Sequence, residues 1–374
     1  HKAPEYFYQF KFTNGRTLKV TPEHPMYVYR KGKLHTIDAK DCNINDFVPI
    51  PKFLPNSSKP INLQSDPFEP HPNAKKIHIP EILTLSIARI LGYLIAEGHS
   101  YVGSAAEIGF SNMDRVLLDD FSKLMEGVFD ISPSIQKRDD GLYTLRYISV
   151  ELYKWFKENF PELLVKSINK RIPKKIMGAS KKIAKHFLRT SFKGDGSVES
   201  TSLCYRTACK GLSEDYQDLL LKLGIQSRIV VDTYNNSFKV YIRGQSLIDF
   251  FNNIVEKDDK RFNKIKKLIK PDKIKTHHHD IFPTSVIEEL IDIKKALSLK
   301  ITGTYWRHLK KRHGITRNKL INELNKIKAK LTKIKETISK EKKIRNIRKS
   351  GFSQQKLSEI SGVSRSNINY YERG

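Results

Sequence analysis

Between residues 81 and 256 the same order of predicted elements occurs twice, and this repeat constrains the fold more than any other feature of the sequence. In the first half, predicted helices at 82–96, 114–129 and 150–160 alternate with predicted strands up to Phe110 and at 143–149. In the second half, predicted helices at 183–194, 213–223 and 246–254 alternate with predicted strands at 198–207, 227–232 and 238–242. A repeated order of this kind indicates gene duplication and a molecule with internal pseudo-twofold symmetry.

Two segments, 90–98 and 188–196, occupy the same place in the two halves and share one layout. Each has small residues four positions apart, which lie on one face of a helix and let two helix backbones approach closely. Each then has an acidic residue followed by a glycine, which is expected to adopt the left-handed conformation that ends a helix. The small residues are Gly92, Ala96, Thr190 and Gly194, and the acids are Glu97 and Asp195.

If the two helices pack against each other, Glu97 and Asp195 are brought together at the helix ends. Two carboxylates at short distance repel each other unless a divalent cation lies between them, and oxygen ligands suit Mg²⁺. The alternative is a pair of ordinary helices that end at glycine, each with an incidental acid. The occurrence of both segments at the same place in a repeat, within a strongly basic chain, favours the paired site.

The charge of the chain indicates the class of its partner, because 68 Lys and Arg against 40 Asp and Glu give a formal net charge of +28. Such a protein attracts polyanions, most commonly DNA or RNA. A lysine-rich, thermophile-like surface is the alternative, but balanced ion-pair networks would require Asp and Glu to rise in step. The three cysteines form no Cys-x-x-Cys pair and no apolar run is long enough to span a membrane. We therefore expect a cytoplasmic protein without a zinc site, a disulfide framework or a membrane partner.

Both acidic segments resemble the LAGLIDADG motif, and their spacing is similar to that of homing endonucleases with two motifs in one chain. The resemblance implies an α+β fold: a monomer with a pseudo-twofold pair of αββαββα repeats, whose sheets form a saddle over a long, asymmetric double-stranded DNA target. It also implies Mg²⁺, with Mn²⁺ as a substitute, bound by the catalytic acids Glu97 and Asp195. The first motif departs from the family by using Glu, whose longer arm would shift the metal, and the second has Thr190 where Gly or Ala is usual.

Two lysines are further candidate catalytic residues. The segment 169–174 resembles the Lys-x-Ile-Pro segment of intein endonucleases, whose lysine is thought to assist cleavage, and Lys170 matches that lysine. Lys239 is a weaker counterpart by its position in the second half. A lysine beside the scissile phosphate stabilises developing negative charge or orients water. For both residues the alternative is a role as one of many lysines that contact phosphate.

The N-terminal residues 5–50 are predicted to form short β-strands around turns at Asn14-Gly15 and Lys31-Gly32. The segment 15–25 resembles the Thr-x-x-His block of inteins, the Hint fold, in which Thr21 and His24 would polarise the peptide bond at the upstream splice junction. The chain starts without a nucleophilic Cys or Ser and ends without a His-Asn pair. We therefore expect an intein fragment, or a degenerate intein, whose endonuclease is intact.

The C-terminal third is basic and is predicted to be helical. Its end, 353–374, resembles the Cro-like helix-turn-helix of phage repressors, with a helix cap at Ser353 and a turn at Gly362, and stops just after the recognition helix. Residues 283–320 are a second candidate helical DNA-contacting segment, whereas the adjacent histidines 277–279 would not share a face and do not predict a metal site. The resemblance to repressors places in the major groove Gln354, Gln355, Arg365, Ser366 and Asn367.

The expected organisation has six parts: a Hint-like β unit (1–52), a linker (53–80), LAGLIDADG repeats (81–178 and 179–256), a basic helical region (257–342) and a truncated helix-turn-helix (343–374). The expected function is Mg²⁺-dependent, site-specific cleavage of both DNA strands by a homing endonuclease within an intein. The alternative is a regulator that joins a LAGLIDADG fold to a helix-turn-helix and binds DNA without cutting it; the retention of both acids favours the enzyme. An RNA-splicing maturase fits the fold but not the intein-like N-terminal segment.

Overall fold

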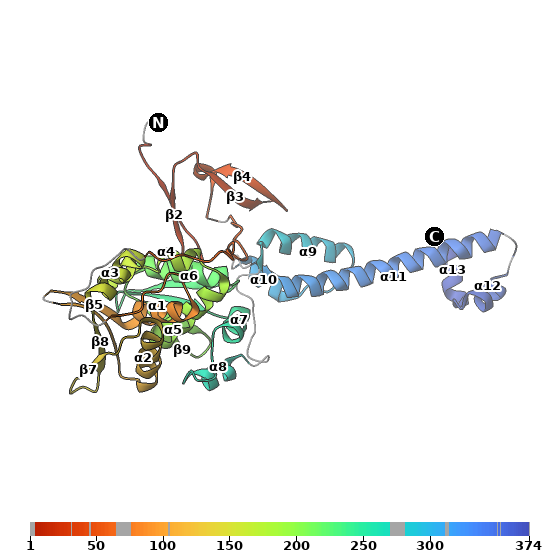
Figure 1. Cartoon of the computed structure of the whole chain (residues 1–374). Coiled ribbons are helices and arrows are strands. Elements are labelled where there is room, and N and C mark those ends of the chain that lie inside the picture. The colour runs from red at the N-terminus through yellow and green to blue at the C-terminus, as the bar shows by residue number, and fades with distance from the viewer. Residues whose placement is uncertain are drawn as a thin grey trace. The chain divides into compact units, whose positions relative to one another are not determined.

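The computed structural model (Figure 1) describes residues 4–30, 32–44, 46–64, 76–103, 105–269, 281–310, 314–349, 351 and 353–373. Contacts between residues divide the chain into two compact units. Unit 1 comprises His1–Met26, Asp38–Asp41 and Pro49–His279, and unit 2 comprises Tyr27–Ile37, Cys42–Val48 and Asp280–Gly374. The predicted β unit at 1–52 is thus divided between the two units, and both predicted repeats lie in unit 1.

The first repeat consists of three helices and a four-stranded antiparallel sheet. Each helix starts after a side chain that accepts a backbone N–H group, namely Thr84, Asp114 and Ser149. The strand order in the sheet is β5-β6-β8-β7, and α2 and α3 pack against it. The elements in chain order are α1 (Leu85–Glu97), β5 (Gly98–Val102), β6 (Ala106–Asn112), α2 (Arg115–Phe129), β7 (Ser134–Lys137), β8 (Tyr143–Ile148) and α3 (Val150–Asn159).

The second repeat has the same order of elements, and its sheet order β9-β10-β12-β11 matches that of the first. The predicted mixture of helices and strands is confirmed, with bounds close to those predicted. The exception is β7, which the sequence did not predict because all four of its residues are exposed and show no alternation. The elements are α5 (Lys181–Asp195), β9 (Gly196–Val198), β10 (Leu203–Thr207), α6 (Lys210–Lys222), β11 (Arg228–Asp232), β12 (Ser237–Ile242) and α7 (Gln245–Asn253).

One hydrophobic core runs through both repeats. The repeats are connected through η2 (Pro161–Leu163), η3 (Ser167–Asn169) and α4 (Lys174–Gly178). Helices α1 and α5, one from each repeat, pack along each other in the middle of unit 1 (Figure 1). The two repeats therefore form one body, with the two acidic helix ends at its centre.

The predicted close approach of these two helices is confirmed by the contacts between their small residues. A Cβ atom at Gly92 would lie 2.1 Å from Thr190 Oγ1 and 2.3 Å from the carbonyl oxygen of Phe187. One turn further along, a Cβ atom at Gly194 would lie 2.5 Å from the Cβ of Ala96. Residues at the same position of the two motifs thus face each other, and each facing pair contains a glycine. Thr190 departs from the usual Gly or Ala, and it fits because its partner is Gly92.

The first hairpin, β1 (Tyr8–Lys11) and β2 (Thr17–Val20), is anchored on the second repeat by its turn. The Ile229 N–H donates to the carbonyl oxygen of Asn14 at 2.9 Å, and Gln217 Nε2 donates to the same oxygen at 3.1 Å. Arg16 donates to Gln217 Oε1 at 2.6 Å and forms an ion pair with Asp218. This hairpin is therefore part of the body of the repeats.

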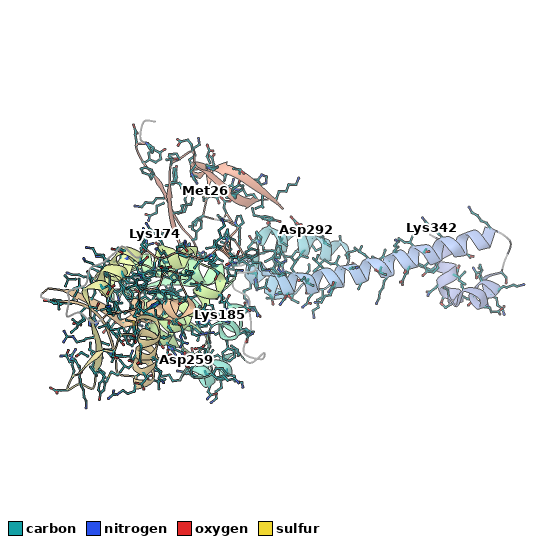
Figure 2. The ribbon with its side chains drawn as sticks, in the orientation of Figure 1. Met26, Lys174, Lys185, Asp259, Asp292 and Lys342 are labelled. Atoms are coloured by element: carbon teal, nitrogen blue, oxygen red, sulfur yellow. The ribbon has the colours of Figure 1, made fainter. Side chains whose placement is uncertain are left out.

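Unit 2 contains most of the hairpin of β3 (Pro25–Arg30) and β4 (Lys33–Asp38), followed in the chain by a largely helical region. A long helix, α11 (Arg317–Lys349), crosses the predicted boundary at 342/343, and Lys342 is labelled in Figure 2. No helix in the described ranges is both long and apolar enough to cross a membrane. The histidines at 277–279 lie outside the described residues. The remaining elements are η1 (Ala39–Asp41) and α8 (Phe262–Leu268) in unit 1, and β13 (Ile281–Phe282), α9 (Thr284–Ala296), α10 (Gly303–Lys310), β14 (Ile315–Thr316), α11 (Arg317–Lys349), α12 (Gln354–Ser361) and α13 (Arg365–Arg373) in unit 2.

Replacement of Gly15 by alanine is expected to release the first hairpin from the second repeat. Gly15 has a φ of +87°, and a Cβ atom there would lie 2.1 Å from the carbonyl oxygen of Ile229. Limited proteolysis should then cut the segment that precedes residue 21 faster than in the parent protein. Gly141→Ala is the matched control, because Gly141 has a φ of +85° but no atom closer than 3.7 Å to the added Cβ. Equal protection of the hairpin in both variants would contradict the anchoring role of the turn.

Replacement of Gly92 by alanine is expected to force α1 and α5 apart, because the added methyl group meets the backbone of α5 at Phe187. The free energy of unfolding of the repeats should fall by about 2–3 kcal/mol, the usual cost of overpacking a tight contact. Denaturant unfolding followed by circular dichroism measures this change. The control is Gly127→Ala in α2, where the added Cβ meets nothing within 4 Å, so stability should rise by roughly 0.5–1 kcal/mol through helix propensity. Similar effects of the two substitutions would refute the tight contact.

Candidate active site at the paired helix ends

The two acids are the last residues of their helices, and the chain passes from each directly into a strand. The glycine after each acid has an extended backbone, with φ −79° and ψ 150° at Gly98 and φ −82° and ψ 145° at Gly196. The predicted left-handed conformation is therefore wrong. Lack of space explains these glycines instead: a Cβ atom at Gly98 would lie 2.5 Å from the carbonyl oxygen of Leu94, and one at Gly196 would lie 2.4 Å from that of Phe192.

The two carboxyl groups influence each other electrostatically. Burial and the neighbouring charge of Glu97 raise the pKa of Asp195 to about 7, although Lys170 acts in the opposite direction. Burial also raises the pKa of Glu97, while a hydrogen bond from Asn112 and the charges of Lys260 and Lys170 oppose the rise. A buried acid whose partner is another acid is costly to ionise. A Cβ atom at Gly194, the residue before Asp195, would lie 4.0 Å from Cγ of Glu97, so the two helix ends that carry the acids lie side by side.

This pair has the chemistry of a divalent cation site. Both donors are carboxylates, the hard oxygen ligands that Mg²⁺ and Mn²⁺ accept, and a cation between them would offset the repulsion that raises the pKa of Asp195. Within the described ranges, no group of three or more His, Cys, Asp and Glu side chains gathers as a metal site would. A cation at the pair would therefore complete its coordination with water or substrate oxygens, as Mg²⁺ commonly does.

Lys170 lies at the end of α1, and its predicted role in cleavage stays a prediction. Its side chain is buried, with 5% exposed, and its ammonium donates to the carbonyl oxygens of Leu94 at 2.8 Å and Gly98 at 2.7 Å. Burial lowers the pKa of Lys170 to about 8, although the charges of Asp195 and Glu97 oppose the shift. The lysine therefore satisfies the carbonyl groups at the end of the helix and places a positive charge beside the acids.

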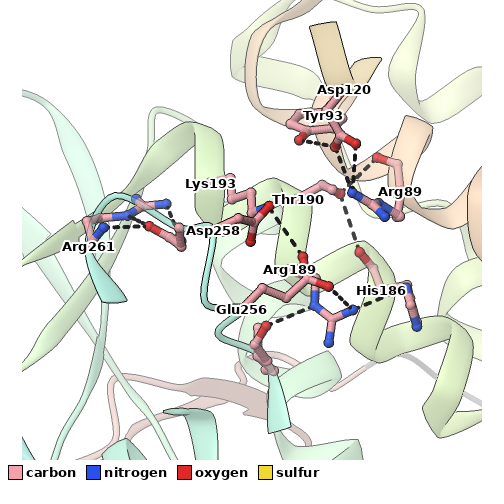
Figure 3. A network of polar contacts seen from close by, with 12 residues as sticks. Arg89, Tyr93, Asp120, His186, Arg189, Thr190, Lys193, Glu256, Asp258 and Arg261 are labelled. Carbon is pink, nitrogen blue, oxygen red and sulfur yellow. Dashed lines mark hydrogen bonds and ion pairs between the residues drawn. The ribbon is translucent and has the colours of Figure 1, made fainter. Parts of the chain in front are cut away.

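Ion pairs along α5 fix the segment that follows the second repeat (Figure 3). The Lys193 ammonium lies 2.8 Å from Asp258 and 3.3 Å from Glu256, and Arg189 lies 2.7 Å from Glu256. The side chains of Lys193 and Arg189 are largely buried, so these pairs are screened less than pairs on the surface. Residues 256–261 are thereby held against the end of α5.

Arg261 occupies, in the second repeat, the place that Lys170 has in the first. Arg261 Nη1 donates to the carbonyl oxygen of Gly196 at 2.5 Å, and its guanidinium lies 4.6 Å from the ring centre of Phe192. Gly196 and Phe192 correspond to Gly98 and Leu94 in the repeated motif. Sequence reasoning missed Arg261 because it compared residues by their position within the repeats, and this residue follows the last helix of the second repeat.

Lys239 lies on the sheet of the second repeat and not among the described contacts of the acids. Its ammonium lies 2.8 Å from Asp232 on the neighbouring strand β11. A hydrogen bond from Asn235 and another from Lys239 hold the pKa of Asp232 far below its usual range. The catalytic role of Lys239 stays a prediction, whereas its observed contact is a cross-strand ion pair.

A cavity of about 420 Å³ opens beside Asp195. Its wall includes Lys170 and Asp195, and Arg206 and Ser237 from the second sheet also line it. A negatively charged group in this cavity would meet two cations and one acid. The cavity therefore suits a phosphate group more than an apolar ligand.

The other predicted site residues lie elsewhere in the structure. Thr21 and His24 are in the turn between β2 and β3, where the His24 N–H donates to the carbonyl oxygen of Thr21 at 3.2 Å. The predicted DNA-contacting residues of the helix-turn-helix belong to α12 and α13 of unit 2; they are exposed, except for Gln354, which is half-buried and donates to Glu372 at 2.5 Å. These residues are Gln354, Gln355, Arg365, Ser366 and Asn367.

Comparison with solved structures finds likeness to homing endonucleases. Mesophilic variants of the homing endonuclease I-DmoI match with a TM-score of 0.38 and 21% sequence identity over 46% of this chain and 92% of theirs. I-DmoI in complex with DNA and Mn matches with a TM-score of 0.37 and 18% identity over 46% of this chain and 95% of that one. Full-length DUF199/WhiA from Thermatoga maritima matches with a TM-score of 0.36 and 15% identity over 65% of this chain and 89% of that one.

Curated relatives are much longer proteins of which this chain matches a small part. A glutamine–fructose-6-phosphate aminotransferase of Methanocaldococcus jannaschii is 28% identical over 47% of this chain and 16% of its own length. The replication factor C small subunit of the same organism is 27% identical over 70% of this chain and 13% of its own length. The replicative helicase DnaB of a Synechocystis species is 25% identical over 82% of this chain and 34% of its own length.

The family model for the LAGLIDADG-like domain matches the chain twice, at residues 84–161 and 183–255. The first match runs from the N-cap of α1 to the end of α3, and the second runs from α5 to just past α7. Each match contains one of the two acids, so the repeats seen in the sequence and in the structure coincide with the matched segments. Two segments of the chain are therefore similar to the LAGLIDADG-like domain, and their first helices meet at Glu97 and Asp195.

Proposed function

We propose that the chain is a site-specific DNA endonuclease that hydrolyses one phosphodiester bond in each strand of a duplex. The observation that carries this proposal is the meeting of Glu97 and Asp195 at the ends of two packed helices, one from each LAGLIDADG-like domain. The charge of Lys170 acts on both acids at the first helix end. Arg261 contacts the carbonyl oxygen of Gly196 at the second helix end, where it also forms an ion pair with Asp259 at 2.9 Å. Two similar half-sites in one monomer suit the two strands of a duplex, which are related by pseudo-twofold symmetry.

The proposed cofactor is Mg²⁺, or Mn²⁺ in its place, held by Glu97 and Asp195. When bound, such a cation lowers the pKa of a water ligand and neutralises charge on the leaving oxygen. The protein contributes the two carboxylates, which accept the cation, and Lys170, whose ammonium stabilises negative charge that develops on the phosphate. Lys239 remains a further candidate for this second role, alongside Arg261.

The strands of the two sheets are proposed to read the bases of the target. The strands concerned are β5 and β6, from Tyr101 to Phe110, together with β8, β10 and β12. On β8, Arg146 is held by Glu107 at 2.6 Å, and on β10, Arg206 is exposed. Arginine side chains presented from strands donate to guanine in the major groove. Because the side chains of the two sheets differ, the target is expected to be long and asymmetric.

An inserted, intein-derived origin is proposed for the chain. Parts of it match short stretches of proteins whose names denote unrelated tasks: an aminotransferase, a replication factor subunit, an ATP synthase subunit and a helicase. A segment common to such different proteins is explained by insertion more simply than by their own activities. The N-terminal hairpins with Thr21 and His24 are the proposed splicing-domain part. Cys42, Cys204 and Cys209 form no disulfide with one another, which suits a cytoplasmic location.

The last two helices are proposed to add a Cro-like helix-turn-helix to the DNA-binding surface. Ser353 caps α12, Gly362 ends it in the left-handed conformation with φ +63°, and Leu357 and Ile368 are fully buried between α12 and α13. This geometry also favours a second candidate function, a regulator that binds DNA without cutting it. The two functions differ in one measurable property, since only the enzyme needs the acid pair.

Substitution of either acid tests the enzyme directly. In Mg²⁺, the parent chain is expected to cleave a subset of a randomised duplex library, and sequencing of the cut ends identifies the target. Asp195→Asn and Glu97→Gln should each reduce cleavage of that target at least about a hundredfold, because a metal ligand contributes several kcal/mol to stabilising the transition state. Binding of the uncut target, measured by gel shift in Ca²⁺, should remain. Binding by the parent without any cleavage would support the regulator, and unchanged cleavage by Asp195→Asn would remove the acids from the mechanism.

Loss of the flanking cations is expected to affect the two strands unequally. Lys170→Met and Arg261→Met should each slow the cut of one strand about a hundredfold, because this is the usual effect of removing one electrostatic contact to a transition state. Nicked plasmid should therefore accumulate. The two variants should nick opposite strands, which primer extension on the nicked product determines. Lys239→Met is the control: strand-specific nicking by this variant, and not by Arg261→Met, would assign the second cation to Lys239. Thermal melting of each variant checks that it is folded.

A further inference from the structure

We propose that residues 281–310 and 314–327 form a separate DNA-binding module whose helix α10 enters the major groove of duplex DNA, at bases other than those read by the two repeats. The inference rests on the proposed DNA-cutting function and extends it with a contact surface in unit 2. It concerns α9 and α10, and not the C-terminal pair α12 and α13.

The module has its own hydrophobic core and its own small sheet. Strands β13 and β14 pair antiparallel, with Ile281 opposite Thr316 and Phe282 opposite Ile315. Helices α9, α10 and α11 each contribute to the core beside β14. The buried core residues are Ile287, Leu290, Ile291, Tyr305, Ile315 and Ile327.

A helix, a turn and a second helix form the front of this module. After the end of α9, Ser298 lies in the left-handed region at φ +53°, and the Leu299 N–H donates back to the carbonyl oxygen of Lys294 at 2.8 Å. This arrangement ends the helix and redirects the chain. Helix α10 then begins after a connection of residues 297–302. A helix-turn-helix of this kind presents its second helix to DNA.

Tyr305 fixes the rotation of α10. Its ring is 2% exposed, and the Lys294 ammonium of α9 lies 5.0 Å from the ring centre. Glu323 is buried as well and accepts from the Lys294 ammonium of α9 at 2.5 Å. One buried cluster thus ties α9, α10 and α11 together, and the opposite side of α10 is left to solvent. A fixed helix loses little conformational freedom when it binds, which favours a recognition role.

The outward side of α10 carries Trp306, which is 53% exposed, and the exposed side chains of Arg307 and Lys310. From residue 300 to residue 319 the sequence contains seven Lys and Arg and no Asp or Glu. The exposed acids of the module lie instead on α9, where Glu288, Glu289 and Asp292 face solvent (Asp292 in Figure 2). The module is therefore electrically polarised, and α10 is its positive side.

Duplex DNA fits this surface better than other polyanions. The major groove of B-form DNA is about 12 Å wide and admits one α-helix, whereas that of double-stranded RNA is too narrow for side chains to read. Helix α10 spans eight residues and offers one aromatic side chain and two cations on one side. Arg307 and Lys310 can donate to guanine or phosphate, and the Trp306 ring can contact a thymine methyl group or a sugar.

The two tryptophans of the chain allow a direct test, because Trp155 is buried in the first repeat and Trp306 is exposed. In the full chain carrying Asp195→Asn, Trp155→Phe leaves Trp306 as the sole tryptophan. The selected target duplex with its flanking sequence should then protect Trp306 fluorescence from acrylamide quenching. The partner variant Trp306→Phe, which keeps Trp155, should show no change on DNA addition and serves as the control.

The same duplex tests the contact energetically. Arg307→Ala with Lys310→Ala should weaken binding about ten- to a hundredfold and lower the salt slope by roughly two, one for each lost phosphate contact. The hydroxyl-radical footprint should also shorten at one end. Lys123→Ala with Lys157→Ala, on the exposed sides of α2 and α3, removes the same charge and should leave the footprint length unchanged.

The outcomes separate the module from the nuclease. In the chain that carries Asp195→Asn, Arg307→Ala with Lys310→Ala should leave the bases under the two repeats protected. In the chain that keeps Asp195, the same double substitution should leave cleavage of a saturated target unchanged. An unprotected Trp306 together with a footprint of unchanged length would overturn the module, even if the parent cleaves normally. Tighter binding of an RNA duplex or a single strand than of the DNA duplex would overturn the assignment to the major groove. Absence of cleavage by the parent would bear on the proposed nuclease alone.

Discussion

The contact between α1 and α5 is the interaction on which the rest of unit 1 depends. Two helices approach this closely only where side chains are nearly absent, and here each facing pair contains a glycine: Gly92 against Thr190 and Gly194 against Ala96. Since residues at equivalent positions face each other, the next equivalent pair, Glu97 and Asp195, must meet at the same end. The packing of apolar and small residues therefore creates the polar site, and the sheets that flank the two helices are placed symmetrically about it.

The meeting of Glu97 and Asp195 at the helix ends has an electrostatic consequence. Two carboxyl groups are brought into a largely buried position, which by itself opposes ionisation, and this shows as a raised pKa of Asp195. The charge of Lys170, which is tied to the carbonyl oxygen of Gly98, opposes this rise. Arg261 is tied to the carbonyl oxygen of Gly196 at the other helix end. The proposed cleavage of DNA would use both kinds of charge, acids for a metal ion and cations for the phosphate. Ion pairs of Lys193 and Arg189 hold the segment that carries Arg261, so the scaffold fixes the position of this cation.

The repeated order of elements and the position of the acids were predictable from the sequence, because helix periodicity and the small-small-acid spacing are local signals. Features that depend on tertiary contacts were not predictable from the sequence. The glycines after the acids were expected to be left-handed, but they are extended and are required by the carbonyl groups of Leu94 and Phe192. Arg261 lies outside the repeat to which it contributes, and the anchoring of Gly15 on Ile229 joins residues more than two hundred positions apart. Neither periodicity nor motif spacing contains this information.

The two half-sites are alike in backbone and different in chemistry. The first motif ends in a glutamate, and a lysine whose pKa burial lowers to about 8 is bound to its helix end; the second ends in an aspartate, and an arginine is bound to its helix end. Glu97 also lies near Lys260, which is bound to Asp114 of α2. A strictly symmetric enzyme would treat the two strands of a palindromic site alike, whereas unequal half-sites suit a target whose halves differ. Duplication therefore supplied the geometry, and the later divergence of the acids and their cations is what would let a single chain distinguish one strand from the other.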